Sequence, residues 1–401
     1  MKKSLFQRLQ QVSLRDIGHI FLYLLALLPS LIYKLTHDAF WLICDYGAEA
    51  RDNGYYFYKY MIENQPDERC IYAIDYRSPD YERVRDLGET VRFGSLKHWI
   101  LYLAAEVNIS SQKGGKPNAA VCYLLEVVLG ILKNKRVFLQ HGIIKDDLPF
   151  VHYDQAKFTM FVTSVKREQD YIAENFGYPD GIVTQTGLAR FDDLYDTSDG
   201  GTILVMPTWR QWINNSDSET QGIEDISDFT KTQYYKCWNE FLNSEELLKL
   251  LDVYDKKLVF YPHRNMQEYA DDFAGEGERI TIAKFPEYDV HELLKASALL
   301  ITDYSSVAMD FAYLDKPVIY YQFDYDRFRE NHMSEGYFSY EADGFGPIAP
   351  DANKLLSEVE LSLATDFALQ PMYKARIDDF FDLRDHNNCE RTYEAILERI
   401  K

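Results

Sequence analysis

The chain has 401 residues, of which 46% are hydrophobic and 15% aromatic, so it is long enough for two or three folded domains with sizeable cores. Its formal net charge of −21 argues against broad nucleic-acid binding, and we expect no nucleic-acid partner. The five cysteines are dispersed, with neither a CxxC pair nor metal-ligand spacing, which indicates reduced thiols in a cytoplasmic protein.

The first 38 residues differ from the rest of the chain. Residues 1–16 carry four basic side chains and a single acid, Asp16. An apolar stretch, Ile17 to Tyr33, follows, but its longest unbroken run has nine residues and ends at Pro29, too short to span a bilayer. A basic and apolar leader on an acidic protein predicts a helical segment, residues 1–38, bound peripherally to an anionic cytoplasmic membrane leaflet. The alternative is a helix packed on the protein's own core.

Short apolar runs and helical patterns alternate through residues 39–195, which predicts an α/β domain with a parallel sheet. The expected strands are 40–44, 70–74, 91–93, 107–110, 136–140, 160–163 and 183–186, and the expected helices are 55–64, 97–104, 121–132 and 169–175.

A polar gap at 192–201 reads as a linker, after which the alternation restarts in a second α/β domain, residues 196–375. Its expected strands are 203–206, 258–261, 280–283, 298–301 and 318–321, its expected helices are 231–251, 290–295 and 307–314, and residues 214–228 are expected to form a surface loop. A C-terminal helix within 376–401 is expected to pack back on the first domain. The two halves predict two Rossmann-like domains facing a central cleft.

Residues 298–321 form the clearest strand–turn–helix–strand unit. The apolar strand stops at Thr302-Asp303-Tyr304-Ser305-Ser306, and a helical pattern starts at Val307. Ser305 or Ser306 would then cap the helix, whose free N–H groups suit an anion such as a pyrophosphate. Capping of a core helix without any ligand is the simpler interpretation of the turn taken alone.

Polar residues also follow the ends of other predicted strands. In open parallel sheets ligands bind at the carboxyl ends of the strands, so these residues together predict a ligand cleft. The candidate site residues are His141, Gly142, Thr208, Arg210, His263, Arg264, Thr302, Asp303, Ser305 and Ser306. The cationic and hydroxyl side chains among them suit an anionic ligand.

Other phosphate-binding signatures are absent from the sequence. There is neither a GxGxxG after a first strand nor a GxxxxGK[ST], so dinucleotide and P-loop sites are not indicated. One D-x-D, Asp324-Tyr325-Asp326, would suit a metal–pyrophosphate, but so short a pattern arises easily in an acidic chain. We therefore expect no tightly bound metal and no cofactor, with charge neutralisation by cationic side chains.

His141 is the candidate for proton transfer. It follows the predicted strand 136–140 and precedes Gly142, which allows a close approach of backbone or substrate. A neutral imidazole near a bound phosphate would remove a proton from an attacking hydroxyl. The alternative is a structural histidine that bonds to its own loop.

The motifs together resemble those of the CDP-glycerol glycerophosphotransferases, the teichoic-acid primases and polymerases with a GT-B fold. The matching stretches run in the family's order over residues 40–325. They are Trp41-Leu42-Ile43, Glu49-Ala50-Arg51-Asp52-Asn53-Gly54, Gln140-His141-Gly142, Thr186-Gly187-Leu188-Ala189-Arg190-Phe191-Asp192, Pro207-Thr208-Trp209-Arg210, Tyr261-Pro262-His263-Arg264 and Thr302-Asp303-Tyr304-Ser305-Ser306.

The resemblance implies a CDP-glycerol or CDP-ribitol donor. It implies attack on the β-phosphate by a hydroxyl of a membrane-linked acceptor, a lipid-linked saccharide or polyol-phosphate, with release of CMP. Transferred by motif, His141 matches the base. Arg210, His263 and the turn at Ser305 and Ser306 match donor-phosphate contacts, with Thr302 beside them. The product would be a teichoic-acid-like or capsular polymer.

The chain departs from the family in two places. Gln140-His141-Gly142-Ile143-Ile144 stands where the family often has Trp-His-Gly-Thr-Pro, which indicates a different acceptor. Asp385-His386-Asn387-Asn388 replaces the usual Asp-Gly-x-(Ala/Ser), which weakens any transfer of roles to Asp385 and Arg391.

Two other functions fit parts of the sequence. The same halves would serve a GT-B glycosyltransferase or an epimerase that uses a sugar nucleotide. A non-catalytic membrane scaffold would need the N-terminal helix but not the polar strand ends. The sequence leaves open whether the polyol is glycerol or ribitol, and whether one unit or many are added.

Overall fold

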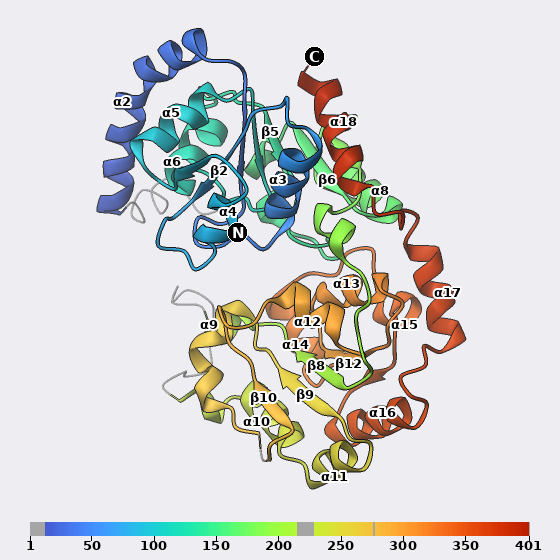
Figure 1. Ribbon diagram of the computed structural model, residues 1–401. Coiled ribbons are helices and arrows are strands. Elements are labelled where there is room, and N and C mark those ends of the chain that lie inside the picture. Colours follow the sequence, from blue (N-terminus) through green and yellow to red (C-terminus); the bar gives the residue numbers. More distant parts are fainter. Residues whose placement is uncertain (1–12, 215–227, 276, 401) are drawn as a thin grey trace. The chain divides into compact units, whose positions relative to one another are not determined.

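The computed structural model describes residues 13–214, 228–275 and 277–400 (Figure 1). The chain forms two compact units. Unit 1 contains the described residues up to Ile143, then Pro149–Asp193 and the C-terminal residues from Asp385. Unit 2 contains Ile144–Leu148 and Leu194–Arg384. The change of unit after Asp193 falls within the polar gap expected to be a linker.

Unit 1 is built on a seven-stranded sheet in the order β3-β2-β1-β4-β5-β6-β7, and every neighbouring pair is parallel. The strands are β1 (Trp41–Cys44), β2 (Cys70–Ile74), β3 (Thr90–Arg92), β4 (Val107–Ser110), β5 (Arg136–Phe138), β6 (Met160–Thr163) and β7 (Val183–Gln185). The helices are α2 (Leu14–Thr36), α3 (Asn53–Asn64), α4 (Tyr81–Arg85), α5 (Leu96–Ala104), α6 (Ala119–Tyr123), α7 (Tyr153–Ala156), α8 (Lys166–Asn175) and α18 (Asn388–Ile400), with short turns η1 (Leu124–Val128), η2 (Pro149–Val151) and η3 (Ala189–Asp193).

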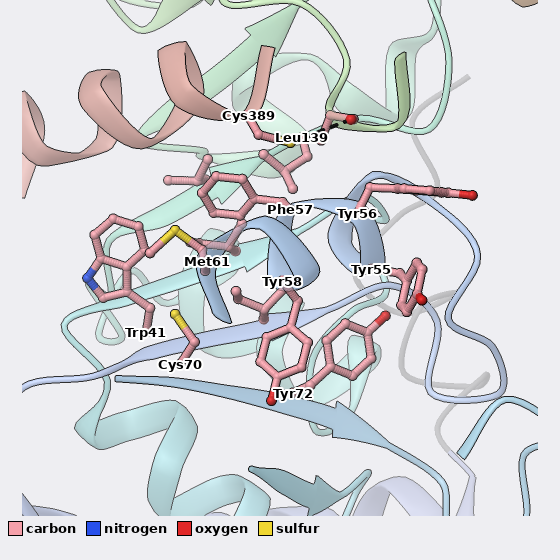
Figure 2. Packing of buried hydrophobic residues seen from close by; sticks show 14 of the residues in the cluster. Trp41, Tyr55, Tyr56, Phe57, Tyr58, Met61, Cys70, Tyr72, Leu139 and Cys389 are labelled. Carbon is pink, nitrogen blue, oxygen red and sulfur yellow. Dashed lines mark hydrogen bonds between the residues drawn. The ribbon is translucent and has the colours of Figure 1, made fainter. Parts of the chain in front are cut away.

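One core of unit 1 lies between the sheet and helices α3 and α18. Figure 2 shows Phe57 and Met61 of α3 gathered with Trp41 of β1, Leu139 beyond β5 and Cys389 of α18. All five side chains are buried. The strands of the sheet read as continuous apolar runs because helices cover both faces, as is usual for parallel sheets.

The C-terminal helix α18 belongs to unit 1 although almost 200 residues of unit 2 precede it. Asp192 of η3 accepts the backbone N–H groups of Asn388 and Cys389, so a carboxylate from another segment caps the helix. Gly187 has φ +86°, and a Cβ there would meet the Asn388 side chain at 1.7 Å. Glycine at this position therefore lets α18 approach.

Helix α2 corrects one expectation about the N-terminus. It is continuous over 23 residues and passes through Pro29, so it is long and apolar enough to cross a membrane by length and composition. Packing holds it on both sides of the proline, since Ala26 and Tyr33 join a second core with α5. The Trp99 indole N–H donates to His19 Nδ1 at 3.0 Å, which ties α2 to α5 by a polar contact as well. The strongly basic residues 2–8 lie outside the described residues.

Unit 2 carries a six-stranded parallel sheet in the order β10-β9-β8-β11-β12-β13. The strands are β8 (Thr202–Met206), β9 (Lys257–Phe260), β10 (Ile280–Ile282), β11 (Leu299–Thr302), β12 (Val318–Tyr321) and β13 (Ile348–Ala349). The helices are α9 (Gln211–Asn214), α10 (Gln233–Leu242), α11 (Glu245–Val253), α12 (Val290–Ala296), α13 (Val307–Tyr313), α14 (Tyr325–Asn331), α15 (Tyr340–Asp343), α16 (Ala352–Ala364) and α17 (Pro371–Phe380), with turns η4 (Phe229–Lys231) and η5 (Arg264–Asp272).

Both sheets have the strand order of doubly wound nucleotide-binding folds, in which the first strand lies beside the fourth. The topological switch points lie between β1 and β4 in unit 1 and between β8 and β11 in unit 2. The predicted α/β architecture with two Rossmann-like parallel sheets is confirmed.

Two expected helices are wrong in extent. The single helix expected over 231–251 is two helices, because Asn243 ends α10 and the Ser244 hydroxyl caps α11 by accepting the Leu247 N–H. The helix expected over 121–132 is the short α6 followed by a π-helical turn that ends at Val128. Both interruptions come from local backbone hydrogen bonding that apolar periodicity does not reveal. Most of the expected surface loop, residues 215–227, lies outside the described residues.

Candidate active site

The switch point of unit 1 is organised by Asp45, the residue that follows β1. Its carboxylate accepts the N–H groups of Gly54 and Tyr55 at the start of α3, at 2.8 and 3.1 Å. It also accepts the hydroxyls of Ser111, which follows β4, and Tyr72. A Cβ at residue 54 would lie 2.3 Å from Asp45 Oδ1, so glycine is needed there. Asp45 thus fixes the loop 45–54 to the sheet.

The Asp45 carboxyl is fully buried, and burial together with the nearby Asp52 carboxylate raises its pKa to about 6. Hydrogen bonds from Ser111 and Tyr72 oppose this shift. A carboxylate whose lone pairs are all used by backbone and hydroxyl donors holds structure. Asp45 therefore positions the site and is not a group for proton exchange with a substrate.

His141 and Asp52 form the reactive pair of unit 1. His141 Nδ1 lies 2.6 Å from Asp52 Oδ2. The imidazole is 71% exposed, whereas the Asp52 side chain is only 12% exposed. Burial raises the pKa of Asp52, but the charge and hydrogen bond of His141 and the charge of Arg190 outweigh it, so the Asp52 pKa lies below its ordinary value. Asp52 is therefore ionised and accepts the proton of Nδ1–H.

The backbone around His141 is held from two sides. Gln140 adopts a left-handed conformation with φ +50°, and its carbonyl accepts the Asn53 Nδ2–H group at 2.8 Å. Asn53 Oδ1 in turn accepts the Arg190 backbone N–H at 3.0 Å. The Arg190 guanidinium donates to the His141 carbonyl at 2.7 Å and lies 3.6 Å from Asp52 Oδ1. A strained residue that is fixed by its surroundings is characteristic of functional sites.

This geometry gives His141 a defined tautomer. With Nδ1–H pointed at Asp52, the Nε2 atom carries the lone pair and is the nitrogen able to take a proton. Nucleophile activation by an imidazole whose other nitrogen faces a carboxylate is the arrangement used in many hydrolases and transferases. Gly142, the next residue, is partly exposed and adds no side chain to the loop.

In unit 2 the switch point is bridged by Asp303, which follows β11. Its Oδ1 atom accepts the backbone N–H groups of Thr208 and Tyr304, at 2.8 and 2.6 Å. Thr302 is buried and its hydroxyl donates to the Met206 carbonyl at the end of β8. The Thr208 hydroxyl is buried and has no hydrogen-bond partner among the described residues. The ends of β8 and β11 are thus locked together, with one unused hydroxyl beside them.

Arg210 is placed differently from what an exposed ligand-binding cation needs. Its side chain is fully buried, and the guanidinium lies 2.8 Å from both Asp303 Oδ2 and Asp324 Oδ2. Burial lowers its pKa, but the two carboxylates outweigh burial and raise it above the ordinary value. Arg210 also donates to the Thr208 carbonyl at 2.7 Å. Its charge is balanced within the protein, and it supports the loop after β8.

The other predicted residues of unit 2 are more accessible. His263 caps the turn η5 by accepting the Asn265 N–H on Nδ1 at 3.1 Å, and Arg264 is exposed with its guanidinium 4.4 Å from the Phe285 ring. Ser305 and Ser306 are both partly exposed at the start of α13. Ser305 accepts the Val307 N–H at 3.3 Å, whereas Ser306 makes no side-chain cap. The expected capping therefore falls to Ser305.

The two aspartates of the D-x-D pattern, Asp324 and Asp326, have different surroundings. Asp324 is buried, pairs with Arg210 and accepts the Tyr304 hydroxyl at 3.0 Å, while Asp326 is exposed. A carboxylate already engaged by a guanidinium and a phenol is a poor metal ligand. The pattern is a structural one.

Sequence reasoning missed several site residues. Asp52, Asn53 and Arg190 lie in the family-like motifs, yet their roles depend on contacts between residues far apart in the chain. No spacing rule would have found these residues, because none stands at the end of a strand.

The comparisons with known proteins bear on the whole chain. The family model of the "CDP-Glycerol:Poly(glycerophosphate) glycerophosphotransferase" matches residues 27–398. The teichoic acid poly(glycerol phosphate) polymerase of Bacillus spizizenii is 32% identical over 398 residues, covering 88% of this chain and 90% of the relative. The minor teichoic acid biosynthesis protein GgaB of Bacillus subtilis is 30% identical over 392 residues, which cover 93% of this chain. The chain spans only 42% of the length of GgaB and 46% of that of a Staphylococcus epidermidis polymerase.

Solved structures share the fold. The wall teichoic acid polymerase TagF superimposes with a TM-score of 0.67 at 17% identity, covering 99% of both chains. A putative UDP-N-acetylglucosamine 2-epimerase from Listeria monocytogenes has a TM-score of 0.57 at 12% identity, covering 91% of this chain and 97% of that one. The fold is thus shared by proteins that are named for different reactions. The family model and the Bacillus spizizenii relative, in contrast, both indicate one family. The chain belongs to the CDP-glycerol:poly(glycerophosphate) glycerophosphotransferase family.

Proposed function

We propose that this protein transfers a polyol-phosphate, glycerol-phosphate or ribitol-phosphate, from a CDP-polyol to a hydroxyl of a membrane-linked acceptor and releases CMP. The observation that carries the proposal is the His141–Asp52 pair, with Nδ1 held 2.6 Å from a carboxylate and the imidazole 71% exposed. Family membership selects the chemistry that this pair serves. The acceptor is a lipid-linked saccharide or a growing polyol-phosphate chain.

The reaction forms one bond to phosphorus and breaks another. The acceptor oxygen attacks the phosphorus that carries the polyol, and the bond from that phosphorus to the bridging oxygen breaks, so CMP leaves with the bridging oxygen. The proton of the acceptor hydroxyl passes to His141 Nε2. Asp52 keeps its negative charge and stabilises the imidazolium that forms. The protein thus contributes positioning and charge stabilisation.

Unit 2 supplies the binding groups for the donor phosphates in this proposal. His263, Arg264 and the hydroxyls of Ser305 and Ser306 are partly or fully exposed at the carboxyl ends of the parallel strands. Thr208, Thr302 and Asp303 join the two central strands and hold the turn that presents these groups. Arg210 acts as a positioning residue. A TagF variant has been solved after a soak with CDPG, which supports a CDP-linked donor for this family.

A donor panel tests the reaction class. The purified protein is incubated with CDP-glycerol, CDP-ribitol or a UDP-sugar and a lipid-linked acceptor analogue, and the products are weighed by mass spectrometry. We expect CMP release and an acceptor heavier by one or more polyol-phosphate units. Release of a nucleoside diphosphate would indicate a glycosyltransferase, a converted sugar nucleotide would indicate an epimerase, and nucleotide binding without turnover would indicate a scaffold.

The same assay tests the base. His141→Ala is expected to abolish turnover, because His141 takes the acceptor proton in this proposal, while CDP-polyol binding stays within about twofold. Near-normal activity of His141→Ala would refute the assignment. A histidine at the far end of α2, His37, serves as a matched control, since it is exposed and its Nδ1 bonds locally to Thr36 and Tyr33.

We also propose that α2 lies in the surface of an anionic membrane, on its cytoplasmic face. The outward side of the helix is apolar, while the opposite side is docked on α5, so the helix is not surrounded by lipid as a span would be. The exposed side chains are Leu14, Ile17, Phe21, Leu24, Leu25, Leu27, Leu28, Leu31, Ile32 and Leu35. So large an exposed apolar face marks an interaction surface.

Vesicle sedimentation tests this location. Each leucine that enters the lipid contributes about 1.5–3 kcal/mol, so Leu24→Glu combined with Leu28→Glu should weaken vesicle binding by roughly a hundredfold or more. The two side chains are 55% and 67% exposed, so the fold is unaffected. Leu361→Glu on α16, 48% exposed, is the matched control. Unchanged binding of the double variant to vesicles rich in anionic lipid would contradict the proposal.

A further inference from the structure

The imidazole of His332 is held between two aromatic rings of unit 2. His332 follows the last residue of α14, and its ring stacks on Phe328 with the centroids 4.7 Å apart. The Trp209 indole meets it nearly edge-on, at 4.6 Å and 76°. Trp209 belongs to the loop after β8, at the switch point of the sheet. The ring of His332 is therefore fixed in orientation beside the carboxyl ends of the central strands.

The protonation of His332 follows from one hydrogen bond. Its Nδ1 atom accepts the backbone N–H of Gln211 at 2.9 Å, so in the neutral ring the proton is on Nε2. Burial and then the positive charge of Arg210 lower the pKa of His332 to about 3, so the ring is neutral at physiological pH. His332 is thus a donor through Nε2–H and not an acid or base.

The Nε2–H group has no acceptor of its own. Its nitrogen is buried and makes no hydrogen bond to any of the described residues. Buried N–H groups are nearly always paired, so an unpaired one needs an explanation. A hydrogen-bond acceptor that arrives with a ligand is such an explanation.

The charges around His332 favour a negative acceptor. Lys145 and Arg329 share a single carboxylate, that of Asp146, so this group carries a net charge of +1. Lys145 and Arg210 both disfavour a positive charge on His332, and Asp146 is the acid that opposes them. Arg210 is paired with Asp303 and Asp324, so the excess positive charge comes from the group of Lys145, Asp146 and Arg329. A neutral N–H donor near this positive group suits the oxygen of an anion.

A second histidine near the same tryptophan also accepts a backbone N–H on its Nδ1 atom. The ring of His263 lies 6.3 Å from Trp209, and its Nδ1 accepts the Asn265 N–H. A neutral His263 therefore also has its proton on Nε2. Two imidazoles, both oriented by backbone N–H groups, stand against one indole.

We propose that His332 is a phosphate-binding residue of unit 2 and donates its Nε2–H to a phosphate oxygen of the CDP-polyol. This inference rests on the proposed function, since it assigns a further residue to the donor site. His332 binds and orients the phosphate and exchanges no proton with it. The aromatic neighbours keep water from the hydrogen bond, which strengthens it.

The test separates phosphate binding from nucleoside binding and from folding. His332→Phe keeps an aromatic ring between Phe328 and Trp209 but removes both nitrogens, and His332→Gln restores a side-chain N–H donor. Affinities of both variants and of the unaltered protein are measured for CDP-glycerol, CDP, UDP, pyrophosphate and cytidine, with thermal unfolding as the check on folding. Turnover is measured with CDP-glycerol.

We expect His332→Phe to bind the phosphate-bearing ligands about tenfold more weakly, a difference of about 1.4 kcal/mol. Cytidine affinity should be unchanged, and His332→Gln should recover part of the loss. An equal loss for cytidine, or no loss for any phosphate-bearing ligand in a folded His332→Phe protein, would overturn the proposal. If the unaltered protein used UDP donors in place of CDP-glycerol, the proposed function would fail. The role of His332 would still be decided by comparing the affinities of the variants for UDP and pyrophosphate with their affinities for cytidine.

Discussion

The carboxylate of Asp52 is the most informative side chain to change, because it tests the assignment of His141 without touching the imidazole. Asp52→Asn keeps the size of the side chain and removes its charge. The side chain also caps α3 by accepting the Asn53 N–H at 2.8 Å, and asparagine caps helices as well as aspartate does. The substitution should therefore leave the fold intact.

The expected magnitude follows from the hydrogen bond. A hydrogen bond to a charged group contributes about 1.5–3 kcal/mol, which corresponds to roughly 10- to 150-fold in rate. The imidazole is 71% exposed and solvent screens part of the charge, so we expect the lower end, about 10- to 30-fold in kcat. Loss of the negative charge also makes a protonated imidazole less favourable. The acidic limb of the pH–rate profile should therefore move to lower pH.

The assay is steady-state CMP release across pH, with the affinity for CDP-glycerol measured separately. KM should change little, because Asp52 acts on the base and not on the donor. Gln112→Ala is a matched control, since Gln112 donates to the same Oδ2 atom at 3.1 Å and its removal leaves the Asp52 charge in place. A kcat of Asp52→Asn within twofold of the unaltered enzyme, with an unchanged pH profile, would refute the pairing of Asp52 with His141.

Two further predictions concern stability. Arg210→Met leaves the carboxylates of Asp303 and Asp324 buried without their partner. The free energy of unfolding of unit 2, measured by denaturant titration, should therefore fall by about 3–5 kcal/mol. An unchanged midpoint of unfolding would contradict the ion-pair assignment. The second prediction concerns His98, which is fully buried and accepts the Gly94 N–H on Nδ1. Burial, and then the charge of His19, lower the pKa of His98 from 6.5 to about 3. The unfolded chain therefore binds the extra proton below pH 6.5, so His98 should cost about 1.4 kcal/mol of stability per pH unit as the pH falls from 6.5 toward 3. A folded His98→Phe variant should lose less stability between pH 7 and pH 5, and an equal loss would count against this cause.

Several elements of the fold were predictable because their signals are local. The strands β1, β2, β4, β6, β8, β11 and β12 lie within one residue of their expected bounds, since short apolar runs between turn residues identify buried strands. The strand order was not predicted, but the alternation of strands with helices indicated two parallel sheets. Helix ends were less reliable. The break at Asn243 and Ser244 depends on backbone hydrogen bonds that an apolar repeat does not report.

The roles of single side chains were less predictable than the elements that carry them. Arg210 was expected to meet an anionic ligand because a cation follows a strand end. The structure instead gives it two carboxylates, Asp303 and Asp324, the second of which lies 114 residues away. Asp324 of the D-x-D pattern, in which we expected no metal site, is engaged in the same contact. Charge pairing across such distances has no signature in periodicity or spacing.

The sequence by itself determined the α/β class, the two halves and the strand ends where polar groups gather, because turn chemistry and apolar runs act over a few residues. Tertiary structure alone decided which polar groups meet. It brought Asp52 to His141 from 89 residues away and turned the exposed face of α2 outward while its other face docked on α5. The physical reason is that a side chain's charge, tautomer and exposure are set by its neighbours in space, and in a doubly wound sheet those neighbours come from distant segments.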